Sequence, residues 1–130
     1  MVTGVLIDSN FYINHLKFRR NPFRELAAAG ADWELFTCGM VMMEVLRGVR
    51  DPRQFAKIEA SFLLMNSIPT SNPVWTKARQ LAWQLDRAGI IIPAQDHLIA
   101  ACALQTGLAV LTADAHFRRM PGLTVLDTLT

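Results

Sequence analysis

Short apolar runs alternate with longer segments bounded by proline and glycine, and this alternation constrains the fold more than any other feature of the chain. Strands are predicted at residues 2–7, 33–38, 67–68, 108–112 and 123–126. The segments between them predict helices at residues 22–29, 39–48, 52–64 and 93–106, and another that starts at Pro73. Strands that alternate with helices indicate an α/β domain with a central, mainly parallel sheet. Since the chain has 130 residues, we expect a single domain over residues 1–130.

Three of the predicted helices begin with the same signal, an Asn-Pro or Asp-Pro pair. Asn21, Asp51 and Asn72 each offer a side-chain oxygen as a cap, and the proline that follows fits the first helical position. Glycines, which tolerate the left-handed conformation, mark the expected helix ends: Gly30, Gly48, Gly89 and Gly107. Apolar stripes at helical spacing predict the buried faces: Phe55, Ile58, Phe62 and Met65; Val74, Ala78, Leu81 and Leu85; Ile99, Ala100 and Ala103.

Four acidic residues stand in unusually apolar surroundings. Asp8 and Asp114 close the runs VTGVLID and GLAVLTAD, whereas Glu44 and Asp96 lie inside the helical segments VMMEVLRGV and PAQDHLIAACAL. Ligands of open parallel sheets gather beyond the carboxyl ends of the strands, so Asp8 and Asp114 meet at one edge if their strands are neighbours. We expect Asp96 to point toward the sheet and Glu44 to lie at the buried edge of the same cleft.

Carboxylates gathered in one cleft repel each other, and this raises their pKa values unless a cation compensates. A ligand set made only of oxygens favours Mg²⁺ or Mn²⁺ over zinc. Such an ion binds phosphates and can activate water for attack on a phosphodiester. Ser9, Asn10 and Thr112 can add hydroxyl or amide contacts around it.

Each acid also has a simpler interpretation when it is taken alone. Asp8 can be a turn or cap residue, and Asp96 can stabilise a helix N-terminus through the helix dipole. Glu44 alone is typical of a solvated helix residue, and Asp114 of an ordinary loop. The order, spacing and apolar flanks of all four together favour a shared site.

Composition excludes several other classes of protein. The formal net charge of +2 neither demands nor excludes nucleic acid as a partner. Cys38 and Cys102 form no CxxC pair, so we expect two buried free thiols in a reducing cytosol and no structural zinc site. No apolar run approaches roughly 20 residues, the length that spans a membrane, and no signal peptide is recognisable, so we expect a cytoplasmic protein. The sequence contains no GxSxG, P-loop, GxGxxG or HExxH motif.

Four segments in a fixed order, VLIDSN, MEVLRG, DHLIAACAL and LTADAHF, carry a family resemblance that spans nearly the whole chain. Together they resemble PIN-domain proteins of the VapC toxin type. The resemblance implies a three-layer α/β/α fold and metal-dependent ribonuclease activity. It also implies that the acidic metal site consists of Asp8, Glu44, Asp96 and Asp114, with Ser9 or Asn10 and Thr112 supporting it through hydrogen bonds.

The position of His116 departs from this pattern, because family members often have an acid there. We interpret His116 as a surface residue or a hydrogen-bond partner of the site in preference to a direct metal ligand. RNA requires positive charge near the cleft, and Arg47, Arg118 and Arg119 are the candidate contacts. Arg118 and Arg119 are favoured because they closely follow Asp114. An ion pair with Glu44, one helical turn away, is the alternative for Arg47.

The leading hypothesis is a Mg²⁺- or Mn²⁺-dependent endoribonuclease, the toxin of a toxin–antitoxin pair. The resemblance further implies a homodimer, an antitoxin that blocks the active site, and cleavage that leaves a 5′-phosphate and a 3′-hydroxyl. One alternative is a noncatalytic PIN-like scaffold that binds RNA or protein, which binding of Mn²⁺ would argue against. Another is a signalling domain that is phosphorylated on Asp8 or a neighbouring acid, which labelling by a small phosphodonor would reveal.

Overall fold

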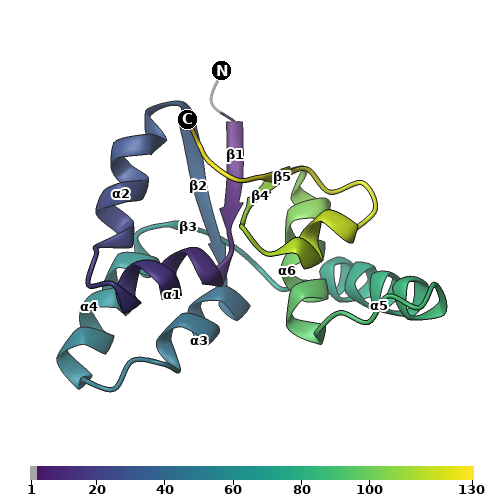
Figure 1. Ribbon diagram of the computed structural model, residues 1–130, viewed down its shortest axis with the longest axis horizontal. Coiled ribbons are helices and arrows are strands. Elements are labelled where there is room, and N and C mark those ends of the chain that lie inside the picture. The colour runs from purple at the N-terminus through teal and green to yellow at the C-terminus, as the bar shows by residue number, and fades with distance from the viewer. Residues whose placement is uncertain (1–2) are drawn as a thin grey trace.

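Five parallel strands lie side by side in the order β3-β2-β1-β4-β5. Figure 1 shows the computed structural model, which describes residues 3–130. The strands are β1 Thr3–Ile7, β2 Trp33–Cys38, β3 Asn66–Ile68, β4 Ala109–Leu111 and β5 Val125–Leu126. All five predicted strands are therefore present and parallel, although several are shorter than predicted and residue 2 of the first lies outside the described residues.

Six α-helices connect and cover the strands. They are α1 Ser9–Lys17, α2 Pro22–Ala29, α3 Gly39–Leu46, α4 Pro52–Leu63, α5 Asn72–Arg87 and α6 Ala94–Thr106, with short 3₁₀ helices η1 Gly30–Asp32 and η2 Ala115–Arg119. In Figure 1, α1 to α4 lie on one side of the sheet and α5 and α6 pack together on the other. The three-layer α/β/α arrangement is therefore confirmed.

The strand order creates a switch point beside β1, where the chain stops adding strands on one side of β1 and starts adding them on the other. From β1 the chain moves outward through β2 to β3, and it then returns to the opposite side of β1 to form β4. The carboxyl ends of β1 and β4 thus diverge into different connections, and this is where open parallel sheets leave a crevice for ligands. Val5, Leu6 and Ile7 of β1 are fully buried, as expected for a strand that is covered on both faces.

Helix α1 is the one α-helix of the described residues that the sequence analysis does not predict; the short 3₁₀ helices η1 and η2 were not predicted either. Its signal is Asp8, whose carboxylate accepts a hydrogen bond from the Ser9 backbone N–H at 2.8 Å and so caps the helix. No proline stands at its first position and no glycine at its end, so it lacks the start and stop signals on which the other helix predictions depend. Tyr12 is the only apolar side chain of this helix that is fully buried.

The predicted stripes and ends hold in most places. Val74, Ala78, Leu81 and Leu85 are all buried, and so are Ile99, Ala100 and Ala103. The stripe on α4 is only half right, because Ile58 and Phe62 are buried but Phe55 is 37% exposed and Met65 is half-buried.

Gly89 and Gly107 have left-handed backbones, with φ of 79° and 69°, whereas Gly30 and Gly48 do not. Cys38 and Cys102 are buried and free, as predicted.

The capping prediction is correct at two of its three sites. Asn21 Oδ1 accepts hydrogen bonds from the backbone N–H groups of Phe23 and Arg24 at 3.1 and 3.2 Å, and Asp51 caps α4 in the same way. The prediction is wrong for Asn72, which is the first residue inside α5. Ser71 stands at the cap position there without a side-chain hydrogen bond to the helix.

We therefore expect Asn21→Ala to lower the free energy of unfolding by about 1 kcal/mol, the usual cost of losing a helix cap. Asn72→Ala is the matched control, because it removes the same side chain from the same Asn-Pro context without breaking a cap. Denaturant unfolding of the two variants measures the difference. An equal loss of stability in both would contradict the capping assignment.

Within residues 3–130, no helix combines the length and the apolar character that a membrane span requires.

Candidate metal centre

Adjacent strands bring the first two acids together. Asp8 directly follows β1, and Asp114 lies three residues beyond the end of β4. These strands pair with Ile7 opposite Leu111, and the Asp8 N–H donates to the Leu111 carbonyl at 3.0 Å. The register of the two central strands therefore places both acids at the switch point of the sheet.

Helices on opposite faces of the sheet supply the other two acids. Glu44 lies on α3, and Asp96 lies in the first turn of α6. The Ser9 hydroxyl is 3.4 Å from both Asp8 Oδ1 and Glu44 Oε1, so it joins these two acids. The charges of Asp8 and Asp96 both raise the pKa of Glu44, and that of Asp114 raises the pKa of Asp96. The four predicted acids thus lie at one end of the sheet and influence one another's ionisation, with Ser9 linking Glu44 to Asp8. Among the described residues, however, the group whose possible ligand atoms lie within 4.8 Å of one another includes Asp96 and Asp114 but not Asp8 or Glu44.

Neutral polar side chains hold the acids in place. Thr112 Oγ1 donates to Asp8 Oδ2 at 2.8 Å and accepts from the Asp114 N–H at 3.0 Å. Asn10 Nδ2 donates to Asp114 Oδ2 at 3.4 Å. Asp8 and Thr112 are almost completely buried, so these bonds fix the Asp8 carboxylate out of contact with solvent, whereas the Asp114 side chain is 23% exposed. The structure therefore places Ser9, Asn10 and Thr112 beside the acids.

Burial and mutual repulsion make the ionised cluster costly. Burial raises the pKa of Asp8, hydrogen bonds from Thr112 and Ser9 oppose this, and the charges of Asp96 and Asp114 add to it. Burial is also the main cause that raises the pKa of Glu44 and of Asp96. A divalent cation among these oxygens would stabilise the ionised forms, so the cluster fits such an ion in both charge and donor type.

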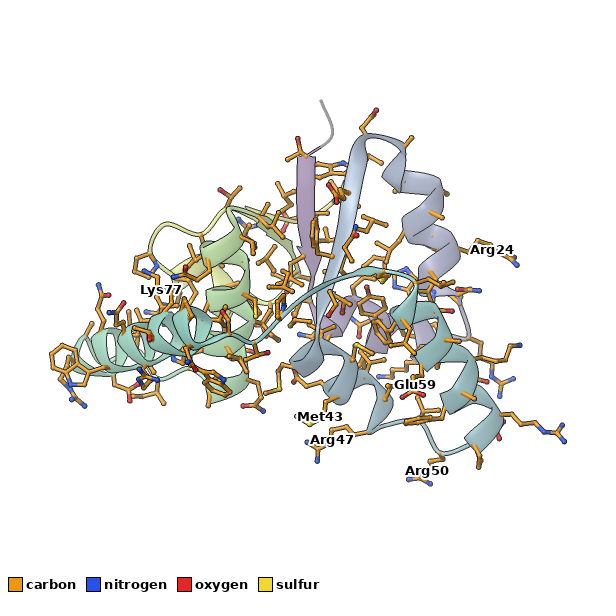
Figure 2. All side chains as sticks on the ribbon, turned by 180° about the vertical axis from the view of Figure 1, so that it is seen from behind. Arg24, Met43, Arg47, Arg50, Glu59 and Lys77 are labelled. Carbon is orange, nitrogen blue, oxygen red and sulfur yellow. The ribbon has the colours of Figure 1, made fainter. Side chains whose placement is uncertain are left out.

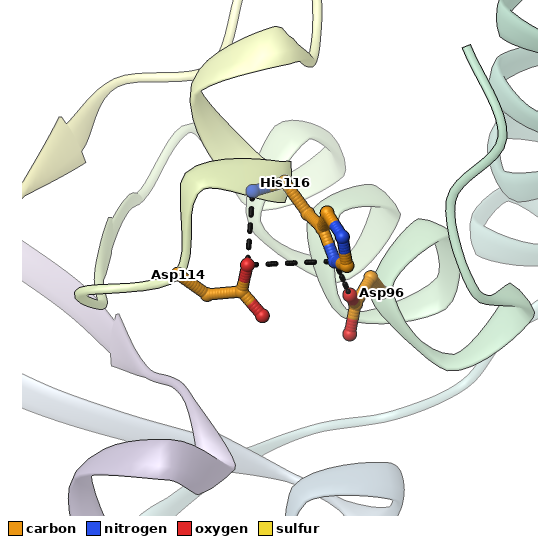
Figure 3. Close-up of side chains that lie close together, drawn as sticks. All are labelled: Asp96, Asp114 and His116. Carbon is orange, nitrogen blue, oxygen red and sulfur yellow. Dashed lines mark hydrogen bonds and ion pairs between the residues drawn. The ribbon is translucent and has the colours of Figure 1, made fainter.

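His116 lies at the centre of the tightest part of the cluster (Figure 3). Its Nδ1 is 2.9 Å from Asp96 Oδ2 and 3.4 Å from Asp114 Oδ1. Asp96, Asp114 and His116 each offer one ligand atom, and these three atoms all lie within 4.8 Å of one another. The sequence analysis considers His116 a surface residue or a hydrogen-bond partner, and the contact with Asp96 shows that it belongs to the site.

The three candidate RNA-binding arginines have different surroundings. Arg118 donates to Asp127 near the C-terminus at 2.5 Å, and Arg119 is exposed beside it. Arg47 caps the C-terminal end of α3 and forms no ion pair with Glu44 in the described part of the chain, although its charge lowers the pKa of Glu44. Figure 2 shows Arg47 and Arg50 projecting outward beyond that end of the helix. Arg47 is therefore exposed to solvent, whereas Arg118 is already paired with Asp127.

The protein is thus a parallel α/β domain with carboxylates gathered at the switch point of its sheet. The PIN domain family model matches residues 5–123, so the chain belongs to the PIN-domain family. Comparison with curated proteins found no match.

Solved structures with the same fold come from toxin–antitoxin systems. VapBC from Salmonella typhimurium, bound to DNA, has a TM-score of 0.81 at 22% identity and covers 97% of this chain and 98% of its own. VapBC2 from Rickettsia felis, bound to a promoter DNA fragment, has a TM-score of 0.80 at 20% identity, with coverage of 95% and 98%. The Mycobacterium tuberculosis toxin VapC20, which cleaves the Sarcin-Ricin loop, has a TM-score of 0.65 at 14% identity, with coverage of 85% and 90%. At these identities the likeness establishes a shared fold.

The raised carboxyl pKa values predict how stability depends on pH. Below the ordinary carboxyl range the acids are protonated in both folded and unfolded chains, and the cluster has no effect. As the pH rises, the unfolded chain loses its protons first, so the folded state is progressively disfavoured until Asp8, Glu44 and Asp96 have also ionised. Without divalent ions, we expect these acids to lower the free energy of unfolding across that interval.

Mn²⁺ at neutral pH should reverse this loss, since an ion that binds only the folded state stabilises it by about 2.7 kcal/mol at about 100 times its dissociation constant. Thermal unfolding over a pH series, with and without Mn²⁺, measures both effects. The Asp96→Asn variant is the control and should show a smaller dependence on pH and on Mn²⁺. Equal responses in the two proteins would contradict the shared cluster.

Proposed function

We propose that this protein is a divalent-metal-dependent endoribonuclease and the toxin of a toxin–antitoxin pair. The single observation that carries the proposal is the convergence of Asp8, Glu44, Asp96 and Asp114 at the switch point of the sheet. Burial and mutual repulsion make the ionised forms of Asp8, Glu44 and Asp96 costly, and a bound cation would offset that cost. The PIN-domain family and the VapC20 likeness support RNA as the substrate.

In this proposal Asp96 and Asp114, aided by Asp8 and Glu44, hold Mg²⁺ or Mn²⁺, which would supply charge stabilisation to the scissile phosphate and activate water. Thr112 and the Ser9 backbone hold the two oxygens of Asp8 in a fixed orientation. Glu44 is half-buried and its pKa is raised, so its carboxylate is suited to accept a proton from the attacking water.

Substrate binding in this proposal relies on positive charge at the rim of the site. Arg47 lies one helical turn from Glu44 and is exposed, so it can contact a phosphate next to the one that is cut. Arg119 is exposed on the other rim, after Asp114. Arg118 contributes only if its bond to Asp127 opens.

A protein partner is supported by apolar surface outside the acidic cluster. A hollow of about 320 Å³ lies between α2 and the end of α4, where Leu64 is 91% exposed; its lining consists of Phe23, Leu26, Ala27, Leu35, Ser61, Leu64 and Met65. The similar VapBC structures are complexes with an antitoxin, and we propose an antitoxin as the partner here. We also propose a homodimer, which is supported by exposed apolar surface at Trp75 and Trp83 on α5.

Calorimetry with Mn²⁺ tests the metal centre on which the proposal depends. The nuclease predicts saturable binding that Asp96→Asn weakens, because one of the carboxylates that hold the ion is lost. A noncatalytic scaffold for RNA or protein predicts no heat of binding in either protein. Phosphorylation of Asp8 by a small phosphodonor, without RNA cleavage, would favour a signalling domain instead.

A further inference from the structure

We propose that His116 Nδ1 is a direct ligand of the divalent ion, together with Asp96 and Asp114. The site is then a mixed nitrogen and oxygen site, which takes a first-row transition ion in preference to Mg²⁺. This inference rests on the proposed function for the presence of an ion, but it concerns which ion binds and through which atoms. It reverses the sequence-based interpretation of His116 as a residue that is not a ligand.

The spacing of the three side chains is the first argument. Two ligand atoms that are each about 2.1 Å from one ion and at right angles to each other lie about 3.0 Å apart. His116 Nδ1 lies 2.9 Å from Asp96 Oδ2 and 3.4 Å from Asp114 Oδ1, which is close to that separation on both sides. One ion can therefore contact all three residues after small movements of their side chains.

The backbone places His116 next to both carboxylates. Asp114 Oδ1 accepts a hydrogen bond from the His116 backbone N–H at 2.9 Å and caps η2. The same carboxylate is held by Asn10, while Asp96 is fixed in the first turn of α6. Figure 3 shows one nitrogen of the ring between the two carboxylates, with dashed lines to Asp96 and to Asp114. The nitrogen is thus already aimed at the place where the oxygens converge.

Ligand chemistry sets the expected selectivity. Mg²⁺ is a hard cation that binds oxygen and keeps much of its water, whereas imidazole suits transition ions. Affinity for a site with a nitrogen ligand rises from Mn²⁺ to Co²⁺. A carboxylate at the position of His116 would leave an all-oxygen site, in which Mg²⁺ competes better. His116 thus determines the choice of ion within an otherwise acidic site.

Pulsed electron paramagnetic resonance of bound Mn²⁺ tests the ligand directly. The full-length protein is labelled with ¹⁵N at histidine only, and wild type is expected to show hyperfine coupling between Mn²⁺ and ¹⁵N. His116→Asp should lose this coupling and keep the ion. His15→Gln is the control and should retain it, since His15 lies on α1 and bonds to Phe11 and Glu25. The remaining histidine, His97, is only 2% exposed and stays unchanged in every variant.

Calorimetry with Mg²⁺, Mn²⁺ and Co²⁺ then tests selectivity. The ratio of Co²⁺ to Mg²⁺ affinity is expected to fall on the order of tenfold or more in His116→Asp, the scale of metal-site perturbations. Mn²⁺ bound by wild type without ¹⁵N coupling, or an unchanged affinity ratio in His116→Asp, would overturn the inference and leave the nuclease intact. Failure of wild type to bind any of the three ions would overturn both the inference and the proposed metal centre.

Discussion

The Asp96→Asn variant is expected to cleave RNA about 10³-fold more slowly than wild type, or not at all, while remaining folded. Metal-ion stabilisation of a phosphoryl transition state is worth several kcal/mol, and each 1.36 kcal/mol is about tenfold in rate. Asp96 accepts the hydrogen bond from His116. Its charge raises the pKa of Glu44, and the charge of Asp114 raises the pKa of Asp96. An amide in its place keeps the shape of the side chain and loses the charge that, in the proposed metal centre, would hold the ion.

The fold should tolerate this change because the lost charge is an unfavourable one. Burial and the neighbouring Asp114 raise the pKa of Asp96, so its ionised form costs the folded state free energy. Glu59→Gln on α4 removes one acid outside the cluster and should cleave RNA at the wild-type rate. Undiminished metal-dependent cleavage by both Asp8→Asn and Asp96→Asn would disprove the assignment of the site.

Phe62→Ala is expected to lower the free energy of unfolding by about 3–5 kcal/mol, which is a large part of the 5–15 kcal/mol that stabilises a typical domain. Phe62 of α4 is 1% exposed and lies in an aromatic cluster with Tyr12 of α1 and Phe23 of α2. The ring centroid of Phe62 lies 4.8 Å from that of Tyr12 and 5.1 Å from that of Phe23. The truncation leaves a cavity where three helices meet, including the helix that begins at Asp8 and Ser9.

Phe55→Ala provides a matched control on the same helix. Phe55 is 37% exposed, so its loss removes less buried surface and should cost well under half as much. Denaturant titration of both variants measures the difference. Comparable destabilisation by the two substitutions would show that the aromatic cluster does not anchor α4 as described.

The elements with strong local punctuation were predictable from sequence. Helix α2 occupies the predicted residues, because a capping asparagine and a proline mark its start, and a glycine follows its end. Strand β2 also matches its prediction, since it is apolar and bounded by helix signals. Helix α1 was not predicted, because its cap is Asp8 itself, which the sequence analysis considers chiefly as a metal ligand. Because Asp8 was interpreted as a metal ligand, its second role as the N-cap of α1 was missed.

The candidate site was predictable where topology alone brings residues together. Asp8 and Asp114 follow neighbouring parallel strands, so their proximity follows from the strand order. The position of His116 was not predictable in this way, because its contact with Asp96 depends on the path of η2 and on a single side-chain rotation. The bond between Arg118 and Asp127 likewise depends on where the C-terminal residues lie, which no local pattern specifies.

Cleavage of purified RNA by the purified protein, before and after removal of divalent ions, tests the central claim most directly. The acidic cluster predicts that cleavage stops on chelation and returns when Mn²⁺ is added back. The products should carry 5′-phosphate and 3′-hydroxyl ends. Cleavage that persists after chelation, or that proceeds equally well in the Asp96→Asn protein, would contradict a metal-dependent nuclease built on these four acids.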